Sequence, residues 1–195
     1  MKLFTVALLA LAAGDSVRAL AASSPEAASR AELEAVCRTT RCRKPSPIRL
    51  KRVDGTVFEM TPDAPMPIVS GGLITVFPGE TVTVEARVEG ERLVDLAAVE
   101  TSTHPERTLV FTLNQEPSIG DGTGMVLKVQ SGFLGVPKYR LGLMRLDSHR
   151  LLKTSSCPLN QGQAAFEQWP EPISQIVASS FRFVDAASKD AKTCE

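Results

Sequence analysis

Residues 81–88 read TVTVEARV, so polar and apolar side chains alternate strictly along this segment. Successive side chains of a β-strand point to opposite faces, and every second residue therefore lies on the same face. We expect one face to be buried and the other to be solvated, as in an antiparallel sheet with one wet side. The residues expected on the buried face are Val82, Val84, Ala86 and Val88. The segment therefore predicts an antiparallel strand that packs on a core.

The same alternation recurs along the chain. Between residues 48 and 60, two alternating runs flank Asp54-Gly55, a dipeptide typical of β-hairpin turns. Another run lies at 125–129, and we expect it to form a long hairpin with residues 139–146. When the weaker alternating runs are included, we expect about eight or nine strands, separated by turns at the spacing of a β-sandwich.

These strands predict a mainly β protein, an antiparallel two-sheet sandwich of immunoglobulin-like architecture, with a small closed β-barrel as the alternative. A short N-terminal helix is expected to begin at Ser24-Pro25 and to end near Val36, because serine caps helices and proline suits their first position. The rings of Phe166 and Trp169 are expected to cover one open end of the sandwich, since large rings need a buried place. This architecture by itself implies no function.

The N-terminus has the features of a signal peptide, because Lys2 precedes an uncharged apolar run that is too short to span a bilayer. Small residues suit the cleavage site at both Ala10-Leu11-Ala12 and Ala19-Leu20-Ala21, and we prefer cleavage after the second. No second long apolar run follows, so the mature protein is expected to be soluble and either periplasmic or secreted.

Three parts of the chain follow from these signals. We expect a signal peptide at 1–21, a helix with a disulfide-stapled linker at 22–47, and a β-sandwich domain at 48–195.

Four cysteines in an exported chain most simply form two disulfides, for which three pairings exist. Cys37 and Cys42 are close in the sequence, so each is at high local concentration near the other. This spacing favours a Cys37–Cys42 bridge and leaves Cys157 to pair with Cys194. Redox centres usually place two residues between their cysteines, and neither histidine has the spacing of a zinc ligand. We therefore expect a short N-terminal staple and a long bridge that fastens the C-terminal segment.

The composition disfavours several classes of partner. Lysine plus arginine and aspartate plus glutamate number 22 each, so no global charge attracts nucleic acid or an anionic membrane. Only 5% of residues are aromatic, which is few for a carbohydrate platform or a groove that stacks single-stranded bases. We expect no nucleic-acid partner, no membrane span, no cofactor and no metal.

The most distinctive local feature is a basic stretch at residues 38–52, which contains no acidic residue. Guanidinium groups bind phosphate and carboxylate bidentately, so the partner could be a lipid phosphate, an acidic cell-wall polymer or an acidic protein surface. The ordinary alternative is a solvated sheet edge, neutralised by acids on neighbouring strands such as Glu80, Glu85 and Glu89. The candidate anion-binding residues are Arg38, Arg41, Arg43 and Lys44, and the stretch also contains Arg49, Lys51 and Arg52.

Motifs for catalysis do not rise above background. His149 directly follows Asp147-Ser148, an order more typical of a polar turn than of a catalytic triad. His104 lies in a polar loop, and Ser70-Gly71-Gly72 lacks the upstream glycine of a nucleophile elbow. Residues 121–124 (DGTG) lack the lysine of a phosphate loop and the ligand periodicity of a calcium loop.

These observations predict an exported envelope protein, a non-enzymatic β-sandwich that binds another protein or an anionic surface component. The alternative is a secreted or periplasmic hydrolase whose site is assembled from distant residues, with His149 as the first candidate base because histidine titrates near neutral pH. A third hypothesis is a structural or inhibitory domain. A deep polar pocket around His149 would favour the enzyme, whereas an exposed apolar or basic face would favour binding.

Overall fold

Strands dominate the described part of the chain. The computed structural model describes residues 25–148 and 150–195, so the predicted signal peptide at 1–21 lies outside the described residues. The chain enters the described part through the helix α1 (Pro25–Val36). The strands are β1 (Cys42–Arg43), β2 (Ile48–Lys51), β3 (Val57–Met60), β4 (Met66–Pro67), β5 (Val69–Ser70), β6 (Leu73–Val76), β7 (Glu80–Glu89), β8 (Arg92–Val99), β9 (Thr108–Gln115), β10 (Met125–Ser131), β11 (Val136–Arg145), β12 (Leu152–Thr154), β13 (Ala164–Trp169) and β14 (Ile173–Val184). Short 3-10 helices are η1 (Pro105–Arg107), η2 (Gly120–Gly122) and η3 (Asp190–Lys192). The predictions of a mainly β chain and of a short N-terminal helix are therefore confirmed.

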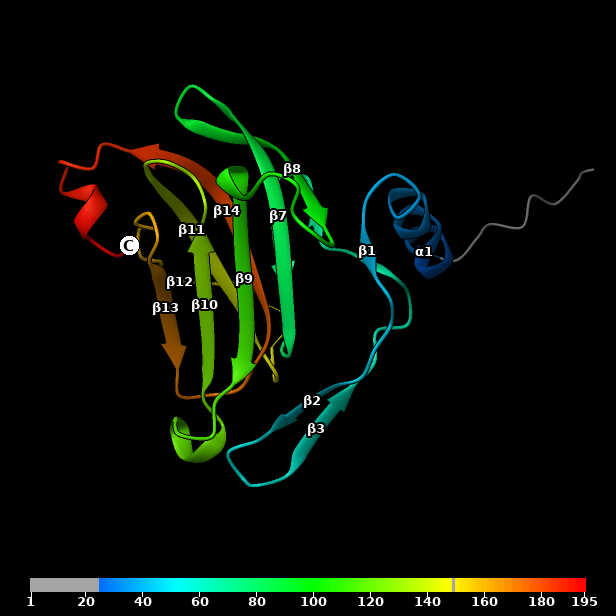
Figure 1. The fold of residues 1–195 in the computed structure, drawn as a ribbon. Helices are drawn as coiled ribbons and strands as arrows, with labels where there is room; N and C mark the ends of the chain where they lie inside the picture. Colours follow the sequence, from blue (N-terminus) through cyan, green and yellow to red (C-terminus); the bar gives the residue numbers. More distant parts are fainter. Residues whose placement is uncertain (1–24, 149) are drawn as a thin grey trace, which may run out of the picture.

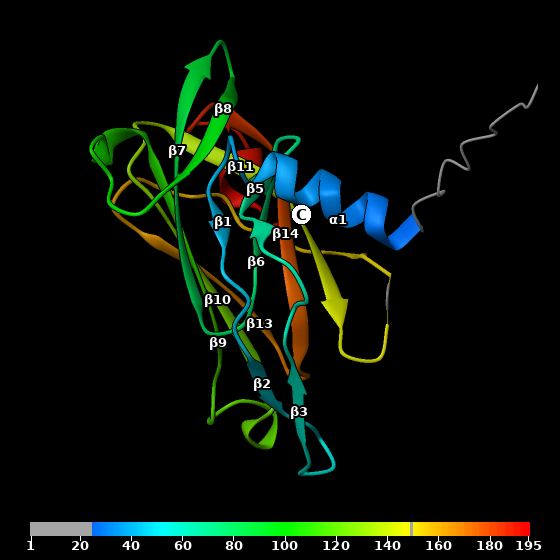
Figure 2. The ribbon, with the colours of Figure 1, turned by 90° about the vertical axis from the view of Figure 1, so that its right-hand side faces the viewer.

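Most strands belong to one antiparallel sheet that folds over into two layers. Its hydrogen-bonded order is β12-β11-β14-β8-β7-β9-β10-β13, and in addition β6 pairs with β14 and β5 pairs with β6. Figure 1 shows β13, β10, β9 and β7 side by side in front of β11, β12 and β14, and Figure 2 shows the layers from the side. The layers join where Arg92 of β8 pairs with Arg182 of β14. Within the described structure the outer strands β12 and β13 do not pair with each other, so the sandwich is open and the alternative of a closed barrel is wrong.

The core lies between the two layers and is built by the alternating residues of the strands. On β9, Leu109, Phe111 and Leu113 are fully buried. The ring of Phe111 meets Tyr139 on β11 and Phe181 on β14 edge to face, with ring centroids 6.1 and 6.3 Å apart. These rings come from both layers, so their packing joins the layers through apolar contact.

Strand β7 confirms the predicted buried face over most of its length. Val82, Val84 and Ala86 are buried. Strand β9 pairs with β7 only between Glu80 and Glu85, so Val88 lies beyond this neighbour and is 43% exposed. The prediction for Val88 is therefore wrong, because the end of the strand extends past the core.

β10 and β11 do not form the predicted long hairpin. β10 pairs with β9 and β13, whereas β11 pairs with β12 and β14 in the other layer. Residues 132–135 therefore cross between layers. Phe133 anchors this crossing, because it is buried and its ring centroid lies 5.8 Å from that of Phe183. A Cβ atom at Gly132 would overlap the Pro105 carbonyl oxygen, so the close approach of these two backbone segments requires glycine there.

The two large rings of β13 have different surroundings. Ala165, Glu167 and Trp169 occupy the inner face of the strand, so Phe166 points outward and is 55% exposed. Trp169 packs partly buried against the core and donates from Nε1 to Oγ1 of Thr154 at 3.0 Å, which links β13 to β12. The prediction that Phe166 covers an end of the sandwich is therefore wrong.

The segment after α1 runs along one side of the sandwich. β1 pairs with β4, and β2 pairs with β3 in a separate two-stranded hairpin at the lower end in Figures 1 and 2. Ile48 and Leu50 of this hairpin are buried in the core. Gly55 in its loop has φ 83°, a left-handed conformation that glycine adopts freely. The predicted hairpin around Asp54-Gly55 is confirmed.

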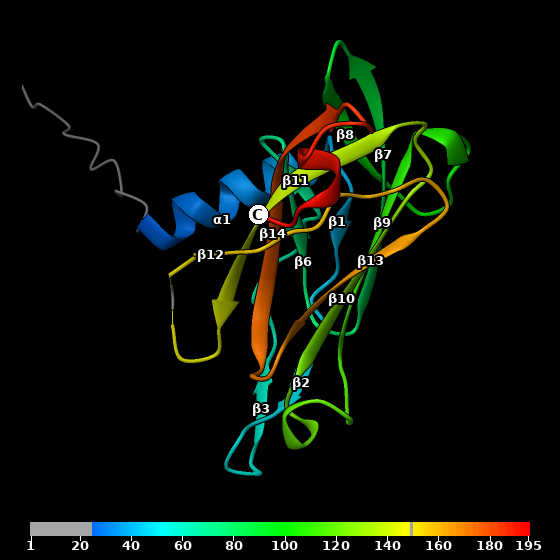
Figure 3. The ribbon, with the colours of Figure 1, turned by 90° about the vertical axis from the view of Figure 1, so that its left-hand side faces the viewer.

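Both predicted disulfides are present. Cys37–Cys42 follows the end of α1, and its Cα atoms are 5.5 Å apart. Cys157–Cys194 joins the loop before β13 to the C-terminal segment, which lies beside β11 and is drawn in red in Figure 3. Across residues 25–148 and 150–195, no helix combines the length and apolar character needed to span a membrane.

Candidate functional site

The stapled loop, residues 37–42 closed by the first disulfide, presents basic side chains to solvent. Arg38 and Arg41 lie within this ring and Lys44 follows it, and all three are exposed. No ion pair of these three residues occurs within the described part of the chain. Arg38 also follows the C-terminal end of α1, where a cation is favoured by the helix dipole. The stapled loop therefore holds two exposed cations, Arg38 and Arg41, on covalently constrained backbone, and Lys44 adds a third just beyond it.

Arg43 differs from the other three candidate anion-binding residues, because the chain itself occupies its guanidinium. Its side chain is only 9% exposed, and its Nε donates to Oε1 of Glu80 at 2.7 Å. Nη1 donates to the Pro67 carbonyl at 3.2 Å and Nη2 to the Thr75 carbonyl at 2.7 Å. The guanidinium also lies 4.6 Å from the ring centroid of Phe77. Arg43 thus fastens β1 to the sandwich, and Glu80 neutralises it as the alternative interpretation expects.

The basic residues of the hairpin also have partners within the chain. Arg49 forms an ion pair with Glu59 at 3.0 Å, and Nζ of Lys51 donates to the Asp121 carbonyl at 2.7 Å. The guanidinium of Arg52 lies 5.4 Å from the centroid of Phe58. The backbone of the stretch runs down the side of the molecule from the end of α1 to the β2–β3 hairpin, as Figure 2 shows, so the basic residues are spread along this side.

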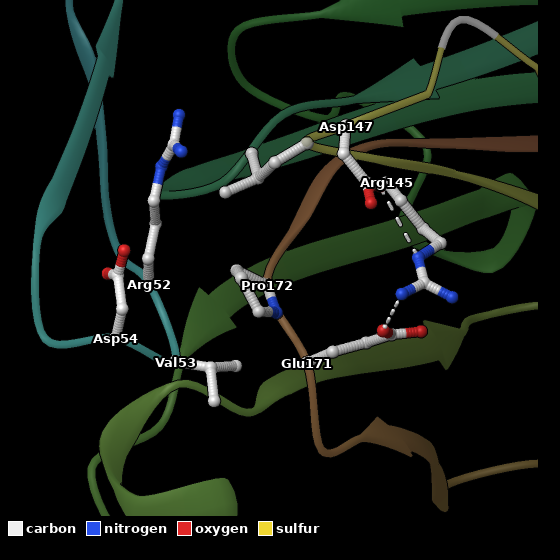
Figure 4. Close-up of a pocket in the computed structure, with 8 residues that line it drawn as sticks. Arg52, Val53, Asp54, Arg145, Asp147, Glu171 and Pro172 are labelled. Atoms are coloured by element: carbon white, nitrogen blue, oxygen red, sulfur yellow. Dashed lines mark ion pairs between the residues drawn. The ribbon is translucent and has the colours of Figure 1, made fainter.

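A pocket of about 320 Å³ opens where the β2–β3 loop meets the ends of β11 and β14. Figure 4 shows Arg52, Val53 and Asp54 on one side and Arg145, Asp147 and Glu171 on the other, with Pro172 between them. Arg145 bridges the two acids opposite the hairpin: its Nη2 lies 2.6 Å from Glu171 and its Nε lies 3.6 Å from Asp147. Charges of both signs therefore line the pocket.

The carboxylates of this pocket have intramolecular partners. Oδ1 of Asp54 accepts hydrogen bonds from the hydroxyl and the amide of Thr56, at 2.6 and 2.9 Å. These bonds, the hydroxyl bond first, hold the pKa of Asp54 below its ordinary value, so this carboxyl is poorly suited to donate a proton near neutral pH. Glu171 and Asp147 are both held by Arg145. The arrangement fits a charge-paired junction between the hairpin and the sandwich better than an acid–base pair.

The other chemical motifs of the sequence do not come together. His149 lies outside the described residues. His104 is exposed and its Nδ1 lies 3.5 Å from Glu106. Residues 70–72 form the β5–β6 turn, and residues 121–124 form a tight turn in which Asp121 has φ 56°. Within residues 25–148 and 150–195, no group of three or more His, Cys, Asp or Glu side chains could hold a metal ion.

Two polar groups lie buried between the layers. Glu167 is 6% exposed, and its Oε1 accepts a hydrogen bond from the Cys157 amide at 2.6 Å. Burial raises the pKa of Glu167. Burial also raises the pKa of Tyr139, and the nearby charge of Glu167 raises it further. The Tyr139 hydroxyl has no hydrogen-bond partner among the described atoms. Glu167 thus fastens the disulfide loop to the outer strand β13.

A second basic cluster is formed by Lys138, Arg140 and Arg182, around the carboxylate of Glu195. It joins β11 to β14 and to the C-terminal segment that directly follows β14, both of which lie far from β11 in the sequence. The local signal is the pair of charged residues Lys138 and Arg140 among the otherwise apolar positions 136–143. Such residues indicate either outward-facing side chains or a buried charge with a partner.

Neither a protein-family model, nor a curated protein, nor a solved structure matches this chain. The function proposed below therefore depends on the residues and their geometry.

Proposed function

We propose that this protein is an exported, non-enzymatic β-sandwich that binds an acidic partner in the cell envelope or outside the cell through the stapled loop and Lys44. The observation that carries the proposal is the exposure of Arg38, Arg41 and Lys44 without a carboxylate partner in the described part of the chain. Arg43, Arg49, Lys51 and Arg52 are left out of the binding surface, because each has an acceptor or a ring within the chain.

The covalent ring supports a binding role. Ordering a long side chain and its backbone on association costs conformational entropy, and a backbone that is already constrained reduces this cost. The Cys37–Cys42 bridge constrains the residues that carry Arg38 and Arg41. Arginine also presents a planar fork of donors that matches a carboxylate or phosphate bidentately. The stapled loop therefore has both the chemistry and the rigidity for recognising an anionic surface.

The proposed location is supported by the cysteines. Disulfides persist in oxidising compartments such as the periplasm and the extracellular space, and both cysteine pairs are bridged. The signal-peptide features of residues 1–21 point to the same compartments.

A charge-reversal variant tests this proposal. We would replace Arg38, Arg41 and Lys44 by Glu and crosslink the protein to its neighbours in intact cells. The matched control replaces Arg150, Lys153 and Lys189, which are also exposed, by Glu and changes the net charge equally. We expect the crosslinked partners to be lost in the first variant and retained in the second, and the association to weaken with added salt. Retention of the same partners by the first variant would refute the role of the stapled loop.

A further inference from the structure

A small cavity lies on the sandwich where β11, β14 and the C-terminal segment meet. Its volume is about 170 Å³. Figure 3 shows the C-terminal segment, in red, lying beside β11 at this place. The residues that line the cavity are Lys138, Tyr139, Arg140, Ser180, Arg182 and Glu195. Three cations and one carboxylate therefore border the same space.

Lys138 supplies a buried charge to this cavity. Its side chain is 2% exposed, and its Nζ donates to Oε1 of Glu195 at 2.6 Å. An ammonium group carries three donors, and Glu195 is its acceptor among the described residues. A buried charge is tolerated only with a partner of opposite sign. The cavity therefore needs an anion beside Lys138.

Arg140 and Arg182 add two further positive charges that an anion in the cavity would neutralise. Lys138 and Arg140 are two residues apart on β11 and so lie on one face, and Lys138 is directly opposite Arg182 on β14. Like charges at directly opposite positions repel unless an anion lies between them. Arg182 reaches Oδ2 of Asp190 at 3.2 Å and Oε1 of Glu195 at 3.7 Å. Arg140 is exposed and forms no ion pair within the described part of the chain.

The strands are irregular at this position. Lys138 pairs with Arg182 and Arg140 pairs with Ser179, so two residues of β14, Ser180 and Phe181, face Tyr139 alone. This is a β-bulge, and Ser180 adopts φ 55°, a left-handed conformation that is unfavourable for a residue other than glycine. Bulges re-aim side chains near functional sites. Here the bulge places Ser180 at the wall of the cavity.

The C-terminal segment holds Glu195 in place. The Cys157–Cys194 disulfide fixes the preceding residue, and two backbone hydrogen bonds join Glu195 to Ser156, at 2.9 and 3.0 Å. A covalently tethered segment therefore brings the carboxylate to Lys138 and Arg182.

We infer that Lys138, Arg140 and Arg182 form a binding site for a phosphate group, and that Glu195 occupies this site as an internal counter-ion. Two guanidinium forks, an ammonium group and the nearby Ser180 suit a tetrahedral oxyanion that carries more than one negative charge. Glu195 pairs with Lys138 and Arg182, and Asp190 pairs with Arg182, so Arg140 is the cation of this cluster that has no ion pair within the described residues. A phosphate group would compete with Glu195 for the same donors. This site is distinct from the stapled loop and does not depend on the function proposed for it.

Removing the internal carboxylate should strengthen phosphate binding. In the full disulfide-bonded protein, Glu195→Gln is expected to bind inorganic phosphate about tenfold more tightly than the wild type, by isothermal titration at constant ionic strength. Adding Arg140→Met to this variant should reverse the gain. Glu171→Gln is the matched control, because Glu171 is also held by an arginine at 2.6 Å but lies in the other pocket. Equal gains in the two Gln variants, or no gain in Glu195→Gln, would overturn the inference.

A second pair of titrations separates the sources of the phosphate group. Phosphoserine is titrated beside inorganic phosphate: tighter phosphoserine binding indicates a phosphorylated ligand, and tighter inorganic phosphate binding indicates the free ion.

If Glu195→Gln does not fold, the wild type and Arg140→Met are titrated with phosphate and followed by NMR. Arg140 is exposed, so its variant should fold. Phosphate-dependent shifts at residues 138, 140 and 182 should occur in the wild type and be lost in the variant. A wild-type spectrum that phosphate leaves unchanged would contradict the site.

Discussion

Nζ of Lys138 donates to Oε1 of Glu195 at 2.6 Å, and this bond joins a buried side chain of β11 to the residue that follows the second disulfide. The hydrogen bond from Lys138 and the charge of the same residue lower the pKa of Glu195 below its ordinary value. The pair thus has a measurable consequence for acid stability.

We expect the Glu195 carboxylate to make stability depend on pH in the acidic range. The unfolded chain binds a proton at Glu195 at higher pH than the folded protein does. The stabilisation is therefore fully present above the unfolded pKa and is lost as the pH falls through the lower folded pKa. Urea denaturation of the wild type and of Glu195→Gln over a series of acidic pH values measures this contribution. Identical slopes of unfolding free energy against pH would contradict it.

Arg43 is expected to stabilise the fold, in contrast to its neighbours in the sequence. Arg43→Met should lower the free energy of unfolding by about 3 kcal/mol, because Glu80 and two carbonyl groups lose a nearly buried partner. Arg38→Met is the control and should change it by about 0.5 kcal/mol or less, since that side chain is exposed. Urea denaturation of both variants checks this difference, and similar losses would mean that Arg43 is not an anchor.

The two disulfides should contribute unequally to stability. They close loops with sequence separations of 5 and 37 residues. On the chain-entropy model, replacing both cysteines of a pair by alanine should cost about 2 kcal/mol for Cys37–Cys42 and about 4 kcal/mol for Cys157–Cys194. Denaturation of the two double variants tests the order, and a larger loss for the short bridge would show that strain or local packing dominates.

Two phenylalanines with different surroundings test the arrangement of the layers. Phe111→Ala should lower the free energy of unfolding by about 4 kcal/mol, because it removes the ring that contacts Tyr139 and Phe181 across the core. Phe166→Ala should change it by about 0.5 kcal/mol or less, since this ring points to solvent. Calorimetric unfolding of the two variants makes the comparison, and a large loss at Phe166 would contradict its outward orientation.

Local patterns predicted the elements better than their partners. The alternation at Val82 and Val84 depends on neighbouring residues only, and both side chains are buried. The run at 125–129 also has the correct buried face, yet the expected hairpin with 139–146 is absent, because the chain crosses to the other layer at Phe133. Alternation of apolar and polar residues shows which face of a strand is apolar, but it does not show which other strand pairs with it.

The candidate sites were predicted to a smaller extent. The basic stretch is visible in the sequence, but the sequence does not show which of its residues have partners within the chain. Arg43 forms an ion pair with Glu80, whereas Arg38 remains exposed. The cluster around Glu195 was not predicted, because Lys138 and Arg182 become neighbours only through the pairing of β11 with β14.

Local sequence patterns were enough to predict most of the long strands, the start of the helix, the Asp54-Gly55 turn and the Cys37–Cys42 pairing, which in turn left Cys157 for Cys194. These features depend on side-chain period, capping chemistry and short loop closure, all of which act between residues near in the chain. The layer to which each strand belongs and the burial of Lys138 against Glu195 arise only when the whole chain is folded. These depend on contacts between distant segments, whose free energies are realised only when the whole sandwich packs.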